Sequence, residues 1–158
     1  MPEYKFEFTN TSSSKDEYIN GYVKVNVNSY TEEKGYGLGN GDYHINENGC
    51  LPTGDNTIKI DVPDGFYDIT VYRKGGARAD VYNNGVQIIN NTTSSGSQNR
   101  PSGYGVMYAP RMEVTGGQIN LAIGNTSGGN ERVASVEVVR VPKKYKKQVV
   151  WIAGDSES

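Results

Sequence analysis

The stretch TIKIDVPDGFYDITVY, residues 57–72, decides the fold because it holds two strand patterns with a turn signal between them. Apolar and polar side chains alternate through residues 57–62, which is the period of a strand with one face in a core and the other in water. The tripeptide Pro-Asp-Gly at 63–65 follows, in which proline fixes φ and glycine tolerates positive φ. Alternation resumes over residues 66–72, so the stretch predicts a β-hairpin.

The same period of two recurs on both sides of this stretch, and no segment sustains helical spacing. Further strands are predicted at residues 4–8, 22–27, 78–82, 86–89, 106–108, 111–114, 119–123 and 132–141. Asn83-Asn84-Gly85 is the signal for a tight hairpin turn of the primed type. The 20 Gly and 12 Tyr also favour turns and strands. The sequence therefore predicts an all-β fold, a two-sheet antiparallel β-sandwich of the jelly-roll type.

Bulk properties exclude several classes of partner. The formal net charge of −2 provides no basic field for nucleic acid. The longest apolar runs are far shorter than the roughly 20 residues that span a bilayer, so no membrane partner is expected. The lone Cys50 allows no internal disulfide, and one Cys with one His does not make a zinc site.

Oxygen-rich loops leave a structural calcium open as an alternative to no cofactor at all. Asn40-Gly41-Asp42 and Asp55-Asn56 offer the carboxylate and amide oxygens that calcium prefers. Turn-forming propensity explains both segments without an ion. We therefore assign no cofactor.

A boundary is predicted near the end of the chain. Residues 142–147, PKKYKK, break the last strand with a proline and a run of charge, as an exposed connector does. In the following QVVWIAGDS, residues 148–156, a wholly apolar strand typical of a buried parallel strand enters Gly-Asp-Ser. We expect a β-sandwich over 1–142, a linker over 143–148 and the first strand of another domain over 149–158.

The Gly-Asp-Ser end of this strand resembles the SGNH/GDSL hydrolases, in which the first strand ends in that tripeptide and its serine is the nucleophile. The upstream region resembles the galactose-binding-like β-sandwich that precedes the catalytic domain in rhamnogalacturonan acetylesterase-like enzymes. The segments that carry this resemblance are FEF at 6–8, YTEEKGYGL at 30–38 and VPDGFYDITV at 62–71. The family usually continues Gly-Asp-Ser with threonine, whereas Glu157 stands here.

The resemblance implies that Ser156 is the nucleophile of a longer, secreted bacterial carbohydrate esterase acting on pectin-type plant cell walls. Serine attacks only with a general base and oxyanion donors beside it, and the family places these groups after the serine. We expect the 158-residue chain itself not to be an enzyme. His44, the single histidine, is expected to be an ordinary loop residue.

Two functions remain open for the sandwich. It is either a carbohydrate-binding module with a polysaccharide, of pectic type by the resemblance, as partner, or a structural domain that packs on the esterase domain without binding sugar. Tyrosine rings cover the apolar faces of sugars, and arginine pairs with the carboxylate of an acidic sugar. The residues predicted to bind ligand lie in or beside loops: Tyr36, Tyr43, Tyr72, Arg73 and Tyr104. Tyrosines inside strands, Tyr82 among them, are left out of this set because alternation makes them sheet residues.

Overall fold

The computed structural model describes residues 3–8, 17–19, 21–25, 30–39, 45, 49–53, 56–74, 79–90, 104–124 and 132–143. These residues form strands and turns and contain no helix. In this part of the chain there is accordingly no helix with the length and apolar character needed to cross a membrane. The strands are β1 (Glu3–Glu7), β2 (Glu17–Ile19), β3 (Tyr22–Lys24), β4 (Tyr36–Leu38), β5 (Ile58–Asp61), β6 (Gly65–Lys74), β7 (Asp80–Asn83), β8 (Val86–Asn90), β9 (Tyr104–Val114), β10 (Gln118–Gly124) and β11 (Arg132–Val141).

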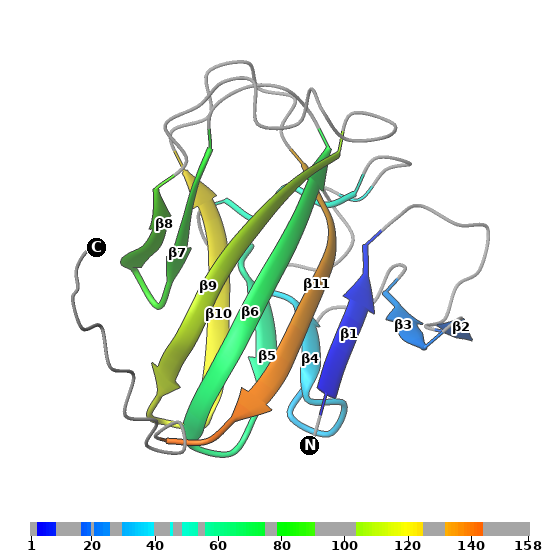
Figure 1. Cartoon of the computed structure of the whole chain (residues 1–158). Helices are drawn as coiled ribbons and strands as arrows, with labels where there is room; N and C mark the ends of the chain where they lie inside the picture. Colours follow the sequence, from blue (N-terminus) through cyan, green and yellow to red (C-terminus); the bar gives the residue numbers. More distant parts are fainter. Residues whose placement is uncertain are drawn as a thin grey trace.

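Two sheets pack face to face (Figure 1). One has the order β2-β3-β1-β11-β6-β9 and the other β4-β5-β10-β7-β8. The pair β1–β3 is parallel, and the other strand pairs of the described residues are antiparallel. The predicted all-β sandwich is therefore confirmed, and the arrangement is consistent with a jelly roll.

The core lies between the sheets and is filled by the alternating apolar side chains. Ile58 and Ile60 of β5, which the alternation predicted to share a face, are 0% and 1% exposed. In register they stand opposite Leu121 and Ile119 of β10. Fully burying such a side chain contributes about 1.5–3 kcal/mol, so these positions hold the two sheets together.

The hairpin predicted for residues 57–72 is wrong. β5 and β6 lie in different sheets, and the turn between them carries the chain across the edge of the sandwich. This crossing is held by Gly117, whose N–H donates to the Asp64 carboxylate at 2.8 Å, and by Tyr67, whose hydroxyl donates to the Pro63 carbonyl at 2.5 Å. The turn signal predicted a change of direction but carried no information on which sheet the next strand joins.

The two strands predicted at 106–108 and 111–114 are one strand, β9, with an irregularity at its middle. Arg111 has a φ of 51° there. The Asp68 carboxylate of β6 accepts hydrogen bonds from the Arg111 N–H and the Tyr108 hydroxyl, each at 2.9 Å. This carboxylate bridges the irregularity, which resembles a β-bulge, so pairing continues on both sides of Pro110.

Other local predictions are confirmed. β7 and β8 form the expected hairpin, with Asn84 and Gly85 at φ values of 51° and 81°, both positive as a primed turn requires. β11 covers the predicted residues 132–141. The described residues end at Lys143, so most of the predicted linker and the strand leading to Ser156 lie outside them.

Candidate functional site

The structure places the predicted ligand-binding residues in different parts of the sandwich. Tyr36 lies in β4 of the five-stranded sheet, and Tyr72 lies in β6 of the six-stranded sheet. Arg73, next to Tyr72, points to the opposite face and is 0% exposed. Its burial leaves no surface for direct contact with a polymer. Tyr104 opens β9, but its side chain is not described, and Tyr43 lies outside the described residues.

From the sequence, Arg78, Arg100 and Arg111 could also pair with the carboxylate of an acidic sugar. Arg78 and Arg100 lie outside the described residues. Arg111 is half-buried, with its guanidinium carbon 5.5 Å from the centre of the Phe66 ring. Cation–π contact of this kind holds the Arg111 side chain against the sheet.

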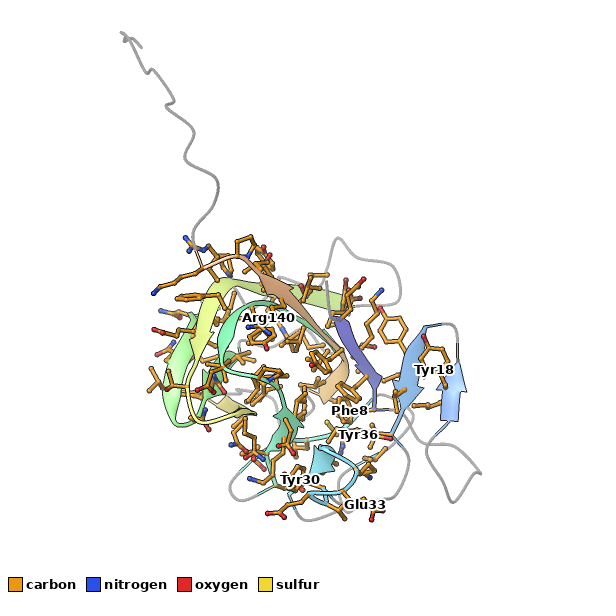
Figure 2. All side chains as sticks on the ribbon, turned by 90° about the horizontal axis from the view of Figure 1, so that it is seen from below. Phe8, Tyr18, Tyr30, Glu33, Tyr36 and Arg140 are labelled. Carbon is orange, nitrogen blue, oxygen red and sulfur yellow. The ribbon has the colours of Figure 1, made fainter. Side chains whose placement is uncertain are left out.

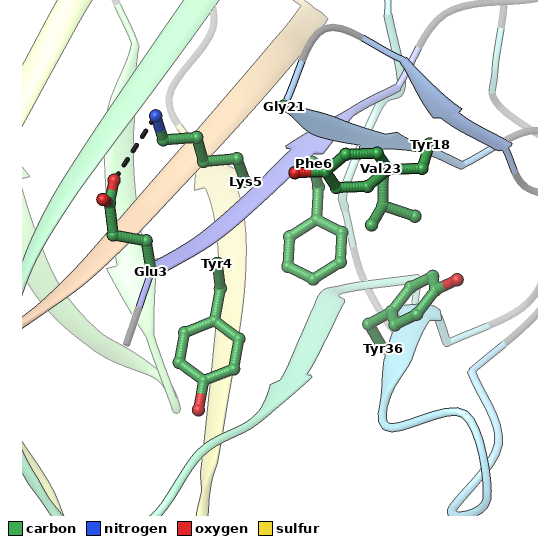
Figure 3. A pocket seen from close by; sticks show the side chains of 8 residues that line it. All are labelled: Glu3, Tyr4, Lys5, Phe6, Tyr18, Gly21, Val23 and Tyr36. Carbon is green, nitrogen blue, oxygen red and sulfur yellow. Dashed lines mark ion pairs between the residues drawn. The ribbon is translucent and has the colours of Figure 1, made fainter. Parts of the chain in front are cut away.

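A pocket of about 380 Å³ opens where Tyr36 lies, between the edges of the two sheets (Figure 3). Three tyrosines line it, one from each of β1, β2 and β4, together with two apolar side chains and an ion pair on β1. We call it the aromatic pocket. The residues that line it are Glu3, Tyr4, Lys5, Phe6, Tyr18, Gly21, Val23 and Tyr36.

Tyr36 is held in place by its glycine neighbours and by the core. Gly35 and Gly37 have φ values of 81° and 138°, which other residues rarely adopt. The Gly35 N–H donates to the Thr31 carbonyl at 2.8 Å, which closes the preceding turn. The Tyr36 ring packs on Phe6 with 4.9 Å between ring centres and 38° between planes. The side chain therefore covers the core and lines the aromatic pocket at the same time.

Tyr18 supplies the exposed ring of the pocket. Its side chain is 76% exposed, so most of the ring remains in water. Figure 3 shows it on the opposite side of the pocket from Tyr36. Glu3 and Lys5 form an ion pair at 3.3 Å along β1. Figure 3 shows this pair on the opposite face of β1 from Tyr4 and Phe6, so the surface of the pocket itself is aromatic and apolar, with the tyrosine hydroxyls as its polar groups.

Tyr72 lies away from the aromatic pocket, on the outer face of the six-stranded sheet, where it interacts with Glu137. Burial and then the nearby Glu137 carboxylate raise the pKa of Tyr72. Burial and a hydrogen bond from its hydroxyl to the same carboxylate raise the pKa of Tyr22. Both phenols therefore stay protonated near neutral pH and are directed toward Glu137.

Two more concavities occur on the described surface. One, of about 520 Å³, lies on the outer face of the five-stranded sheet over β5, β10 and β7. The other, of about 460 Å³, lies where the described chain ends and is lined by Gly65, Phe66, Arg140, Val141, Pro142 and Lys143. Sequence alternation indicated which residues face outward, but the cross-strand neighbours that build these surfaces come only from the pairing of distant strands.

Among the residues that the structure describes, no three His, Cys, Asp or Glu side chains are grouped so that they could hold a metal ion. The segment 40–42, considered for calcium, and Asp55 lie outside the described residues. Asn56 is 2% exposed. The calcium alternative therefore stays a prediction.

Comparison with known proteins supports the fold. No known protein family matches the chain, and no curated protein does. A crystal structure of the protein YxiM from Bacillus subtilis superimposes with a TM-score of 0.62 and 21% identity, covering 90% of this chain and 41% of that one. A β-glucuronidase of Bacteroides uniformis superimposes with a TM-score of 0.51 and 11% identity, covering 89% of this chain and 18% of that one.

The chain thus spans about two-fifths of YxiM and less than one-fifth of the β-glucuronidase. At these identities the similarity shows the fold alone. The chain shares its β-sandwich fold with one part of each of these larger proteins, one of which is by its name a carbohydrate-active enzyme.

Proposed function

We propose that this chain is a non-catalytic carbohydrate-binding domain that holds a sugar in the aromatic pocket. The observation that carries the proposal is the arrangement of Tyr4, Tyr18 and Tyr36 around a pocket of about 380 Å³. Pockets of about 300–1,000 Å³ accommodate small ligands. Tyrosine rings cover the apolar faces of a sugar, and tyrosine hydroxyls donate to or accept from its hydroxyls.

Two observations support a further proposal, on the kind of larger enzyme to which this domain belongs. The fold is shared with part of a protein named as a β-glucuronidase. The resemblance to rhamnogalacturonan acetylesterase-like enzymes supports a role as the galactose-binding-like accessory domain of a secreted bacterial esterase acting on pectin-type polysaccharides. In that setting Ser156 is the nucleophile of the longer enzyme, and residues 1–158 alone do not hydrolyse esters.

Affinity electrophoresis against pectins, rhamnogalacturonan, xylans and β-glucans, with and without calcium, tests the proposal. Tyr18→Ala is the cleanest variant because the Tyr18 ring is 76% exposed and its removal leaves the core intact. We expect about tenfold weaker binding, the equivalent of ~1.4 kcal/mol for one lost ring contact. Tyr108→Ala removes a tyrosine that is 54% exposed on β9, away from the pocket, and should leave binding unchanged.

Failure of the unmodified chain to bind any of these polymers would contradict the proposal. Equal binding by the Tyr18 and Tyr108 variants would move the sugar out of the aromatic pocket. Catalytic inactivity is tested separately with chromogenic esters. Hydrolysis that disappears in Ser156→Ala would show that the chain is an esterase after all.

The alternative, a structural domain that packs on an esterase domain, is favoured by the concavity beside the predicted linker. This concavity has a volume of about 460 Å³, and Phe66, Val141 and Pro142 form the apolar part of its lining. Arg140 lies there and not beside Tyr18 or Tyr36, as Figure 2 shows. An apolar surface next to a connector is suited to docking against the domain that follows.

Hydrogen exchange distinguishes the alternative from sugar binding. In a longer chain that carries an SGNH domain after Ser158, docking predicts slower exchange around residues 65–66 and 140–143 than in the 158-residue chain. Identical exchange in the two proteins would refute docking at this surface.

A further inference from the structure

A second surface of the sandwich has the chemistry of a ligand site. It is the concavity of about 520 Å³ on the outer face of the five-stranded sheet, which we call the sheet groove. Register places Lys59 of β5 beside Asn120 of β10, and Tyr82 of β7 beside Ala122 of β10. The polar and aromatic side chains that line it are Thr57, Lys59, Tyr82, Asn84 and Asn120.

Asn120 organises the floor of the groove. Its Nδ2 donates to Asn84 Oδ1 and to Gln118 Oε1, both at 2.8 Å. Its Oδ1 accepts from Lys59 Nζ at 2.8 Å and from the Thr57 hydroxyl at 3.1 Å. An amide group has two donors and two acceptor positions, so all four are used. The Asn120 side chain is thereby fixed, and it fixes the ammonium group of Lys59.

Lys59 is held by neutral groups only. Among the residues that the structure describes, no ion pair of Lys59 is found. An ammonium group has three N–H donors, of which Asn120 takes one. The groove therefore presents a fixed positive charge with donors left for a ligand.

The nearest carboxylate along β5 on this face is already occupied. Asp61 accepts hydrogen bonds from the Tyr30 hydroxyl at 3.0 and 2.8 Å and from Gln118 Nε2 at 2.9 Å. Gln118 thus separates Asp61 from Asn120 and Lys59. Among the carboxylates that the structure describes, none complements the charge of Lys59.

Tyr82 forms a platform next to this charge. A Cβ added at Gly124 would lie 2.7 Å from Tyr82 Cε1, so the ring rests directly against the backbone of β10. Only glycine leaves that space. The edge of the ring therefore meets the β10 backbone, and the half-buried ring lines the groove, where it can stack on a sugar.

We infer that the sheet groove is a second binding site, for a sugar that carries a carboxylate. Lys59 pairs with the carboxylate of the uronic acid, the Tyr82 ring covers the apolar face of the sugar, and Asn84 donates to or accepts from its hydroxyls. The inference goes beyond the proposed function, because it concerns another face of the sandwich and does not depend on the aromatic pocket.

The test is calorimetric titration of the chain with polygalacturonate and with the same polymer after chemical reduction of its carboxyl groups. Loss of a charge-assisted hydrogen bond in Lys59→Gln is expected to weaken polygalacturonate binding tenfold or more and to leave binding of the reduced polymer unchanged. Lys24→Gln removes the same charge on the other sheet, outside the groove, and is the control.

Gly124→Ala tests the platform without removing any polar group. The new methyl group displaces the end of the Tyr82 ring, so binding of both polymers should fall several-fold while thermal unfolding stays close to that of the parent. Equal affinities of Lys59→Gln and Lys24→Gln for polygalacturonate would overturn the inference.

The two proposals fail separately. Binding that is lost only in Tyr18→Ala would place every sugar in the aromatic pocket, which overturns the sheet groove and keeps the proposed function. Binding of polygalacturonate that is lost in Lys59→Gln but not in Tyr18→Ala would support the sheet groove and contradict the aromatic pocket. A chain that binds neither polymer overturns the sheet groove.

Discussion

Gly49→Ala is the substitution for which the structure predicts a large loss of stability. Gly49 has a φ of 124°, and a Cβ there would lie 2.1 Å from the Val133 carbonyl oxygen and 2.6 Å from its carbon. The neighbouring Cys50 exchanges two backbone hydrogen bonds with Val133, each 2.9 Å long. Backbone atoms of β11 cannot move away from the new methyl group without breaking that bridge.

The expected loss of stability follows from three contributions. Two backbone hydrogen bonds contribute about 0.5–1.5 kcal/mol each. A side chain at positive φ costs about 1–2 kcal/mol. Opening the bridge also loosens Cys50 and Val133, which are 0% and 1% exposed. We therefore expect the free energy of unfolding to fall by about 3–5 kcal/mol, a large share of the roughly 5–15 kcal/mol typical of a domain.

Gly116→Ala is the matched control, because Gly116 also has a positive φ, 95°, but a Cβ there would meet no atom of the described residues within 4 Å beyond its own chain neighbours. Its cost should be about 1–2 kcal/mol, from the dihedral alone. Urea denaturation followed by circular dichroism measures both. If Gly49→Ala lies within about 1 kcal/mol of Gly116→Ala, the close approach to β11 is relieved cheaply and the reasoning fails.

Three further predictions concern titration and the irregularity in β9. Burial raises the pKa of the Cys50 thiol, so a thiol reagent should label it only after unfolding, and rapid labelling of the native protein would contradict its buried position. The pKa of Tyr22 is raised by burial and by Glu137, so the folded state holds this proton more tightly than the unfolded state. The contribution of Tyr22 to the free energy of unfolding should therefore be constant below the ordinary tyrosine pKa of about 10 and be lost above it. Denaturation curves at rising pH should accordingly show a smaller fall in Tyr22→Phe. Asp68→Ala removes both hydrogen bonds of the carboxylate to β9 and should lower the free energy of unfolding by about 2 kcal/mol in thermal denaturation, with a smaller loss in Asp68→Asn. No change would mean that β9 keeps its shape without the bridge to Arg111.

Part of the candidate surfaces could be anticipated from the sequence. The two flanking glycines single out Tyr36, and the structure places it in a pocket. Strict alternation after Tyr67 also puts Arg73 on the inner face with Ile69 and Val71, where the structure has it, so its burial was readable from the sequence.

The sheet groove shows the opposite case. Alternation predicts that Lys59, Tyr82 and Asn120 face outward, and for that reason Tyr82 is absent from the predicted ligand-binding residues. Their meeting depends on β10 lying between β5 and β7. Residues 59, 82 and 120 are far apart along the chain, and no local pattern states which strands become neighbours.

What the sequence determined by itself is the local geometry: the strand segments, the face that each side chain takes, and the β7–β8 hairpin, whose turn needs positive φ only at Asn84 and Gly85. Such features depend on backbone sterics and on the contrast between apolar and polar neighbours. Both are properties of a few consecutive residues, so a short segment is enough to determine them. Only the tertiary structure decided that β5 and β6 part into separate sheets and that the aromatic pocket and the sheet groove exist. Those outcomes are set by packing between residues distant in sequence, because the free energy gained by burying both inner faces depends on the whole set of strands at once.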